Sequence, residues 1–236
     1  ILSTAVDWNI LMNNPAERAK PQKVTKPKAK YYNDKQVADM FQCLKSEPLM
    51  YMTMIYLAID IGLREGELTG LKWEDINFEK CTMNIERTAI YVRGKGLVLG
   101  GTKNDSSCRV IAIPISLAQI LQEFRNYKEA EFAKVGVEIK SNDFVFAEVD
   151  GHLLRPDTFG GWMRRFHGLN PDLKEIPPHG LRHTNASLLI AQGVDVRTVA
   201  SLLGHAQAST TLDIYAHAFD KNKRKAQEKL GKAIGL

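Results

Sequence analysis

The chain has 236 residues, of which 44% are hydrophobic and 25% are charged. This composition excludes a disordered tail and allows a large buried core, either as one domain or as a domain with an appendage. The net charge of +5 is compatible with a polyanionic partner but indicates nucleic acid only weakly, and no apolar run is long enough to span a bilayer.

The cysteines argue against disulfide and zinc-binding scaffolds. Cys43, Cys81 and Cys108 are odd in number and have no short spacing, so neither a disulfide framework nor a zinc knuckle is indicated. We therefore expect a protein of the reducing cytoplasm.

The N-terminal part is predicted to be an appendage on a cationic linker. Residues 1–19 form a short segment with a helical start, and residues 20–30 form the linker. From Arg18 to Lys30 there are six basic residues and no acidic one, which is typical of either a solvated hinge or a strap that follows phosphates. Because the chain begins with neither Met nor a signal sequence, we expect it to be part of a longer protein.

Two helices are predicted next. The first begins at Asn33, an N-cap residue with Gln36 three positions later. Its apolar stripe consists of Val37, Met40, Phe41 and Leu44. Residues 49–61 are apolar on nearly all sides, which predicts a central buried helix ended by Gly62.

A short β region follows. β-Branched residues alternate with polar ones in residues 82–92, and residues 109–113 have a similar pattern. Glycines separate these runs at positions 94, 96, 100 and 101. The simplest interpretation is a small three-stranded antiparallel sheet, with residues 102–107 as a turn between two of its strands.

The rest of the chain is predicted to be helical. Apolar stripes recur in residues 117–124, behind an N-cap at Ser116, and in residues 159–166, 196–203 and 212–219. Gly204 would stop the third of these helices. The expected fold class is therefore mostly α with a small antiparallel β-sheet, an α+β arrangement.

Several residues of this region could carry chemistry, although each has an ordinary structural explanation. His179 and Arg182 would share one face of a helix starting after Pro178 and could hold one phosphate oxygen, but such a pair is common on surfaces. His205 follows Gly204, where a capping histidine is usual. Tyr215 lies on an apolar stripe, as a core tyrosine would.

Two further candidates lie upstream. Arg64 directly follows the predicted central helix, and Glu67 stands three residues later as the partner for a plain ion pair. Lys103 lies in the predicted turn, where a solvated lysine is expected. Each residue taken singly is weak support for a site.

Taken together and in order, these pieces are specific. They are Gly62-Leu63-Arg64-x-Gly66-Glu67-Leu68, Thr102-Lys103 before an Arg-started strand, His179-x-Leu181-Arg182-His183-Thr184, Leu203-Gly204-His205 and Tyr215-x-His217. The set resembles the tyrosine recombinase (phage integrase) family, especially integrases of Gram-positive phages and conjugative elements. The resemblance runs from about residue 31 to residue 219 and implies the tyrosine recombinase catalytic-domain fold.

The resemblance also implies a catalytic set. Its members are Arg64, Lys103, His179, Arg182, His205 and the nucleophile Tyr215. Arg64 and Arg182 would hold the non-bridging oxygens of a DNA phosphate. Lys103 would be the general acid toward the leaving 5′ oxygen, and His205 would donate a hydrogen bond to the phosphate.

The remaining roles concern protons and support. His179 would accept the proton of Tyr215, because an ordinary phenol pKa of about 10 leaves little phenolate at neutral pH. Glu67 would orient Arg64, and His183 would orient its helix. Since a 3′-phosphotyrosyl intermediate retains the bond energy, the resemblance implies no cofactor, no metal and no ATP.

The implied partners follow from the same family. They are a double-stranded DNA recombination site and other protomers of the same chain in a synaptic tetramer on DNA, with no membrane. The protein would be cytoplasmic and encoded by a bacterium or a phage. Residues 1–19 would be the C-terminal remnant of a preceding core-binding domain, residues 31–219 the catalytic domain, and residues 220–236 a tail that either docks on a neighbouring protomer or frays.

Three other functions share some of these features. His179 and His183, four apart on a helix and followed by His205, imitate the zinc site of a metallohydrolase, although Gly180 stands where such a helix carries Glu. A non-catalytic DNA-binding module would explain the basic linker but not the ordered set that ends in Tyr215. A type IB topoisomerase would share the chemistry and differ in its outcome.

Overall fold

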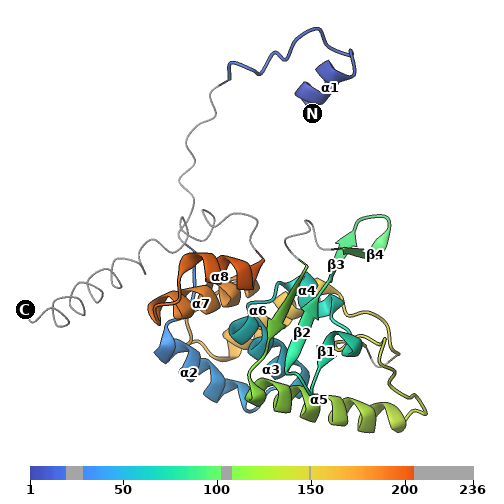
Figure 1. The fold of residues 1–236 in the computed structure, drawn as a ribbon, viewed down its shortest axis with the longest axis vertical. Helices are drawn as coiled ribbons and strands as arrows, with labels where there is room; N and C mark the ends of the chain where they lie inside the picture. The colour runs from blue at the N-terminus through green and yellow to red at the C-terminus, as the bar shows by residue number, and fades with distance from the viewer. Residues whose placement is uncertain (20–28, 102–107, 149, 205–236) are drawn as a thin grey trace, which may run out of the picture.

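The computed structural model describes residues 1–19, 29–101, 108–148 and 150–204 (Figure 1). Lys103, His205 and Tyr215 lie outside the described residues, as do the predicted helix at residues 212–219 and the tail at residues 220–236. Helix α1 (Leu2–Asp7) agrees with the helical start predicted for the N-terminal segment. In the described part of the chain, no helix is long and apolar enough to cross a membrane.

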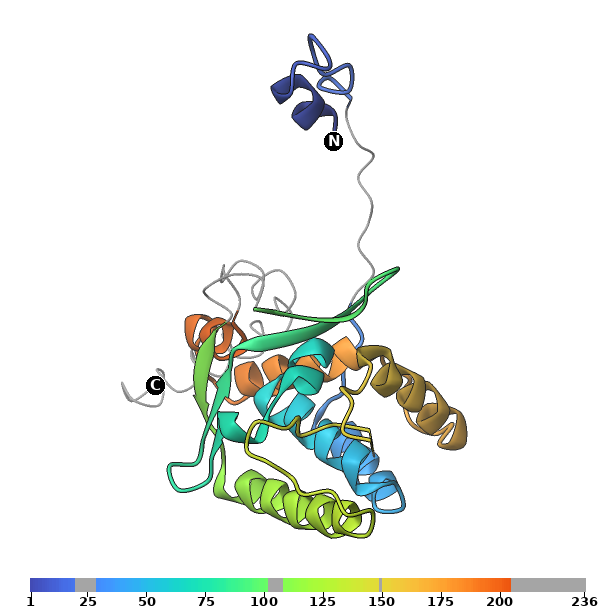
Figure 2. The same cartoon turned by 90° about the vertical axis from the view of Figure 1, so that its right-hand side faces the viewer.

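The central layer is built from the helices predicted around residue 50. Helix α2 (Asp34–Leu44) begins with the predicted capping box of Asn33 and Gln36. Helix α3 (Leu49–Tyr56) continues into a π-helical segment, η1 (Leu57–Ile61), that ends at Gly62. Figure 2 shows α3 between α5 (Ile115–Ala133) and α7 (Pro178–Ala191). This position explains why the sequence of α3 and η1 has no polar face.

The π-helical segment has a structural consequence for the site. Its wider turn leaves backbone carbonyls without their usual α-helical partners. The side-chain amide of Asn185 on α7 donates to two of them, Ile59 O and Asp60 O, at 2.8 Å each. This bond pair fixes α7 against the end of η1, where the chain turns toward Arg64.

Next come a short helix, α4 (Glu65–Gly70), a 3₁₀ turn, η2 (Trp73–Asp75), and, among the described residues, five strands in two sheets. Strands β1 (Ile76–Asn77), β2 (Thr82–Ile85) and β5 (Arg109–Ala112) form an antiparallel sheet in the order β1-β2-β5. Strands β3 (Arg87–Val92) and β4 (Gly96–Gly101) form a separate antiparallel hairpin. Figure 2 shows this hairpin extending beyond the helices.

The strands differ from the prediction in two ways. The run at residues 82–92 divides at Glu86 into β2 and β3, which belong to different sheets, and the glycine-rich residues 96–101 form β4. Glycine disfavours strands, but here the antiparallel pairing of Val92 with Gly96 through Arg87 with Gly101 overrides that preference. Because β4 and β5 lie in different sheets, the predicted turn that carries Lys103 does not join two paired strands.

Three of the remaining helices, α5, α6 (Pro156–Leu169) and α8 (Val196–Leu203), agree with predicted stripes, and α7 agrees with the helix predicted to start after Pro178. The prediction of Ser116 as an N-cap was wrong by two positions, because Pro114, with its φ fixed near the helical value, precedes the first turn of α5. All four residues of the α6 stripe are buried: Phe159, Trp162, Met163 and Phe166. Helix α8 ends at Gly204 as predicted, with φ 63°.

Candidate active site

The first part of the site is the junction between η1 and α4. Arg64 is the N-cap residue of α4, and its backbone N–H donates to Glu67 Oε2 at 3.1 Å. Its guanidinium donates to Glu67 Oε1 at 2.5 Å. The Glu67 side chain is 3% exposed and that of Arg64 is 35% exposed. Glu67 therefore holds both the backbone and the side chain of Arg64.

Arg182 forms the second part. It lies in the first turns of α7 and is only 1% exposed. Its guanidinium donates to Gly62 O at 2.7 Å and also to Leu203 O. These carbonyls belong to the ends of η1 and α8, where the helix dipoles favour a positive charge. Arg182 is thus a buried cation that holds two helix ends together, and not one member of a surface pair.

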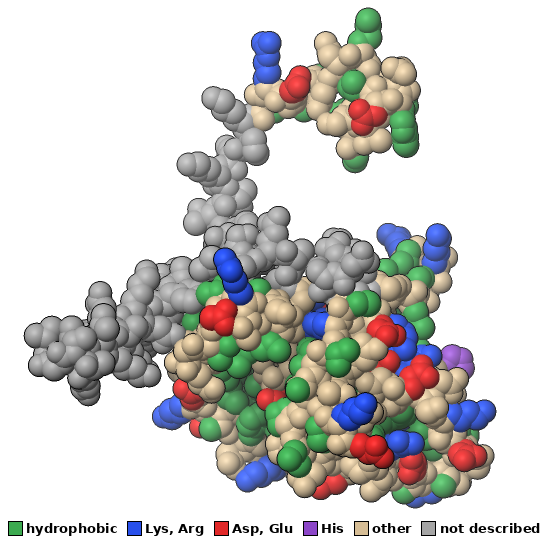
Figure 3. Space-filling view, viewed as in Figure 1, with side chains coloured by type: hydrophobic (Ala, Val, Ile, Leu, Met, Phe, Trp, Pro, Cys, Tyr) green, Lys and Arg blue, Asp and Glu red, His purple; other side chains and the backbone are tan. Residues whose placement is uncertain are grey.

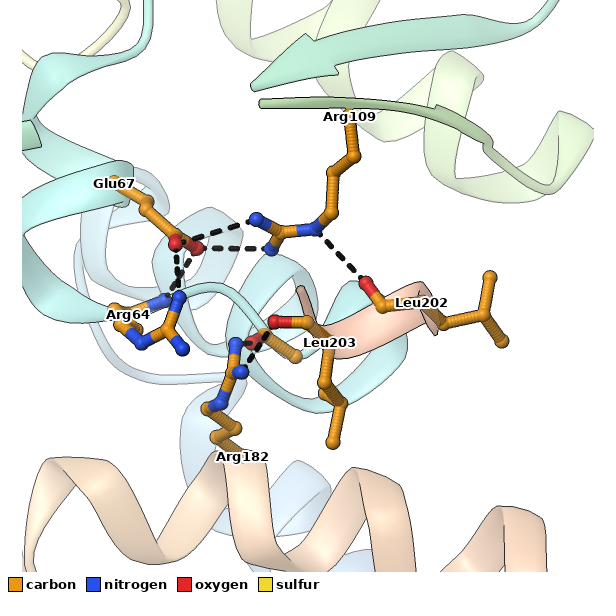
Figure 4. Close-up of polar contacts among 7 residues, drawn as sticks. Arg64, Glu67, Arg109, Arg182, Leu202 and Leu203 are labelled. Atoms are coloured by element: carbon orange, nitrogen blue, oxygen red, sulfur yellow. Dashed lines mark hydrogen bonds and ion pairs between the residues drawn. The ribbon is translucent and has the colours of Figure 1, made fainter. Parts of the chain in front are cut away.

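A third arginine joins the first two, and the sequence prediction had not named it as a site residue. Arg109, the first residue of β5, donates to both oxygens of Glu67, at 3.0 Å and 3.3 Å. Its Nε donates to Leu202 O at 2.9 Å. Figure 4 shows the three guanidinium groups, which come from the N-cap of α4, from α7 and from β5, around Glu67 and the end of α8. One feature of the sequence could have identified Arg109: it is the first residue of the strand that follows the segment with Lys103.

Three glycines of the motifs are explained by close approach. Gly62 and Gly204 both have positive φ, of 74° and 63°, which ordinary side chains rarely adopt. A Cβ at Gly62 would lie 2.5 Å from Leu203, and one at Gly204 would lie 3.0 Å from the guanidinium of Arg109. A Cβ at Gly180 would lie 2.6 Å from the backbone oxygen of Lys30. These contacts allow α4, α7, α8 and β5 to meet at one place.

The charges of the cluster do not cancel. Burial by itself would raise the pKa of the Glu67 carboxyl, but the hydrogen bond and charge of Arg109, with the charges of Arg64 and Arg182, hold that pKa below its ordinary value. One carboxylate therefore faces three guanidinium groups, which leaves an excess of two positive charges. Such an excess suits an anion with more than one negative oxygen, such as a phosphate in the course of substitution.

The histidines of α7 are uncharged at neutral pH. Crowding of the ring, and then the charges of Arg182 and Arg64, lower the pKa of His179. Burial, then His179 and Arg182, lower the pKa of the half-buried His183 to about 4. The two rings meet edge to face with centroids 4.7 Å apart. A neutral His179 can accept a proton.

Five of the eight predicted site residues lie among the described residues, and their interactions place them together. They are Arg64, Glu67, His179, Arg182 and His183. Lys103, His205 and Tyr215 are outside the described residues. The cluster nevertheless includes Gly204, which immediately precedes His205, and Arg109, which begins the strand after residues 102–107.

The geometry bears on the metallohydrolase alternative. At position 180, where a metalloprotease helix carries Glu, the backbone of Lys30 passes too close for any side chain. The charge of Arg182 also acts on the two histidines and, after burial, helps to lower the pKa of each. In the described ranges, no three His, Cys, Asp or Glu side chains are grouped so that they could hold a metal ion.

Comparisons with known proteins give a consistent result. Residues 30–222 match the phage integrase family. The ICEBs1 integrase of Bacillus subtilis (strain 168) is 28% identical over 230 residues, which cover 98% of this chain and 62% of that protein. A XerC-like tyrosine recombinase of Caldanaerobacter subterraneus subsp. tengcongensis is 31% identical, covering 96% of this chain and 61% of the relative. For a XerA tyrosine recombinase of Thermococcus kodakarensis the identity is 31%, and the coverage is 92% and 68%.

Solved structures show the same fold. The Tn1549 transposon integrase, in complex with a circular intermediate DNA, aligns with a TM-score of 0.77 and 22% identity, covering 97% of this chain and 75% of that one. The XerA recombinase aligns with a TM-score of 0.64 and 19% identity, covering 95% and 73%. The chain spans about three fifths of the length of the first two relatives named above, 62% and 61%.

Proposed function

The chain belongs to the phage integrase family of tyrosine recombinases, as its match over residues 30–222 shows, and from this membership we propose that it is the strand-transfer part of a site-specific DNA recombinase. The proposal covers cleavage and rejoining of a double-stranded DNA recombination site through a covalent phosphotyrosine. We also propose that protomers of this chain assemble into a synaptic tetramer on DNA, and that the protein is cytoplasmic and encoded by a bacterium or a phage.

The observation that carries the proposal is the buried guanidinium cluster. Arg64 and Arg182 are 118 positions apart in the sequence, yet both act on Glu67. Planar guanidinium groups match the non-bridging oxygens of a phosphate, and a cluster with excess positive charge favours the pentavalent state over the ground state. Among the described residues, Arg64 is the guanidinium with a large exposed fraction in this cluster, and it is the one we place against the DNA.

The chemical step is an in-line substitution at phosphorus. The hydroxyl oxygen of Tyr215 forms a bond to the phosphorus, the bond to the 5′ oxygen breaks, and the departing oxygen takes a proton from Lys103. His179, neutral at neutral pH because its pKa is lowered, accepts the proton of Tyr215, and His205 donates a hydrogen bond to the phosphate. The 5′-hydroxyl of a partner strand then attacks the phosphotyrosine and reverses the step.

A group of basic side chains on one face would indicate where DNA binds, but the described residues on the face drawn in Figure 3 form no such group. In Figure 3, the Lys and Arg side chains of the described residues are interspersed with Asp and Glu. We expect DNA binding by this chain to be weak, because the chain spans about three fifths of the relatives' length, and strongly dependent on salt, because it would rest on phosphate contacts. The division into a preceding-domain remnant at residues 1–19, a linker at residues 20–30, a catalytic domain at residues 31–219 and a tail at residues 220–236 belongs to the same proposal.

Covalent trapping tests this function. Incubation with a nicked suicide substrate should give a protein–DNA adduct that survives denaturant, and chelator should not prevent it. The variant Tyr215→Phe should bind DNA and form no adduct, because it lacks the attacking oxygen. The matched control is Tyr127→Phe, which changes an exposed tyrosine of α5 and should form the adduct at the rate of the wild type.

Two of the three rival functions have their own outcome in this assay. Wild-type protein that binds DNA but never forms an adduct would be a non-catalytic DNA-binding module. Cleavage that stops on addition of chelator would point to a metallohydrolase. Adduct formation by Tyr215→Phe at the rate of the control would show that another residue is the nucleophile.

A further inference from the structure

Arg109 has an unusual set of partners for a residue outside the predicted catalytic set. Its two Nη groups donate to the two oxygens of Glu67, and its Nε donates to Leu202 O. The first partner is 42 positions away in the sequence and the second is 93 positions away. One rigid guanidinium therefore fixes the distance between α4 and the end of α8.

These two partners are next to functional groups. Glu67 accepts hydrogen bonds from the backbone and the guanidinium of Arg64. Leu202 O and Leu203 O lie side by side at the end of α8, where Arg109 holds the first and Arg182 holds the second. The next two residues are Gly204 and His205. Arg109 thus connects Arg64, through Glu67, to the chain segment that leads into His205 (Figure 4).

The charge of Arg109 changes what Arg64 can do. If Glu67 faced Arg64 alone, a carboxylate at 2.5 Å would neutralise the charge that a phosphate needs. Arg109 takes both oxygens of Glu67, so that the carboxylate is shared between two cations. Arg64 is then held in position and the group as a whole stays positive.

Arg109 is not the member of the cluster that we place against the DNA. Its side chain is 7% exposed, whereas that of Arg64 is 35% exposed. Gly204 also lies against its guanidinium, since a Cβ at that position would come within 3.0 Å of Nη1. A role through neighbouring residues remains.

We propose that Arg109 is a positioning residue for strand transfer. Through Glu67 it holds Arg64 in place, and through Leu202 it holds the end of α8, which leads into His205. This inference rests on the proposed function, because Arg64 and His205 are given their roles there. It predicts an effect on the rate of the chemical step and none on DNA affinity.

The test compares two arginines by the same substitution. Arg109→Lys keeps the charge and loses the fork, and it should slow adduct formation on the suicide substrate by about 100-fold, the cost of a misplacement near 1 Å. The half-saturating DNA concentration should stay within about twofold. The control is Arg87→Lys. Arg87 begins β3 and donates two similar hydrogen bonds to Asp75, and its replacement should leave the rate unchanged.

Folding is checked in the same samples. The assay is run at a temperature where circular dichroism of both variants equals that of the wild type. Equal rates for Arg109→Lys and Arg87→Lys under these conditions would overturn the proposal. So would a loss that comes entirely from a higher half-saturating DNA concentration, because it would make Arg109 a DNA contact.

A double mutant tests the path through Glu67. In a Glu67→Gln background the carboxylate that Arg109 grips is absent, so Arg109→Lys should reduce the rate by a much smaller factor than in the wild type. The same factor in both backgrounds would show that Arg109 does not act through Glu67.

A second measurement needs no activity and separates the two proposals. Amide hydrogen exchange at residues 199–204 reports on the end of α8. It should be faster in Arg109→Lys than in the wild type and unchanged in Arg87→Lys. If the wild type forms no adduct but Arg109→Lys still exchanges faster than the wild type, the proposed function is refuted and the positioning contact is retained. If exchange in Arg109→Lys equals that of the wild type, the positioning contact is refuted.

Discussion

Two arginines in this molecule make the same local contact with opposite consequences. Arg87 and Arg109 are the first residues of β3 and β5, and each donates both Nη groups to one carboxylate, Asp75 for Arg87 and Glu67 for Arg109. The side chain of Arg87 is 23% exposed and that of Arg109 is 7% exposed. The difference lies in what surrounds each pair.

Around Arg87 the negative groups are in excess. Glu74 and Glu86 also lie 3.4 Å and 3.6 Å from its guanidinium, and Lys72 contacts Glu74 at 3.6 Å, so three carboxylates face two cations. Around Glu67 the reverse holds: Arg64 and Arg109 both donate to its carboxylate, and the nearby charge of Arg182 acts on it as well. The Arg87 pair is a structural clasp with no net attraction for an anion, whereas the Glu67 cluster is a positively charged site. The same pair of residue types thus acquires a role from its neighbours.

The largest expected difference between the two pairs is in stability. Glu67→Ala would leave three guanidinium groups in a mostly buried place without a counter-charge, which should lower the free energy of unfolding by about 3–5 kcal/mol. Asp75→Ala leaves Arg87 with solvent and two other carboxylates, so a loss of about 1 kcal/mol is expected. Urea denaturation of both variants measures the difference. Equal losses would mean that burial of the cluster does not govern its energy.

A smaller effect is expected at the glycine beside Arg109. Gly204→Ala combines a positive φ with the contact to the guanidinium, whereas Gly94→Ala, in the β3–β4 turn, has φ 83° and nothing within 4 Å of its Cβ. The backbone conformation alone should cost about 1 kcal/mol in each. The excess loss in Gly204→Ala, measured by urea denaturation, reports the displacement of Arg109, and an excess of zero would show that the guanidinium moves aside freely.

The smallest effect concerns pH. Because the folded pKa of Glu67 is held below its ordinary value of 4.5, its ionised form stabilises the fold above pH 4.5, and this contribution is lost as the pH falls through the folded pKa. The difference in unfolding free energy between wild type and Glu67→Gln should therefore be constant at neutral pH and shrink below pH 4.5. In total, this difference in unfolding free energy should shrink by about 1.4 kcal/mol for each unit by which folding lowers the pKa of Glu67. A difference that stays constant down to pH 3 would contradict the assigned charge state.

Most helices could be predicted from the sequence because their signals are local. The Asn33 capping box, the buried stripe of α6 and the stop at Gly204 each lie within a few residues of chain. The strands were less predictable. Thr82–Ile85 and Arg87–Val92 look alike in sequence, and pairing with β5 in one case and β4 in the other assigns them to different sheets.

The sequence by itself determined the family and the candidate residues, because ordered motifs such as that around Arg182 are identities that need no coordinates. Tertiary structure alone decided that Arg182 is buried against two helix ends and that Arg109 belongs to the cluster. Arg109 contacts Glu67 and Leu202 across 42 and 93 positions. No periodicity or spacing reports a contact over that range, because it forms only when separate elements pack together.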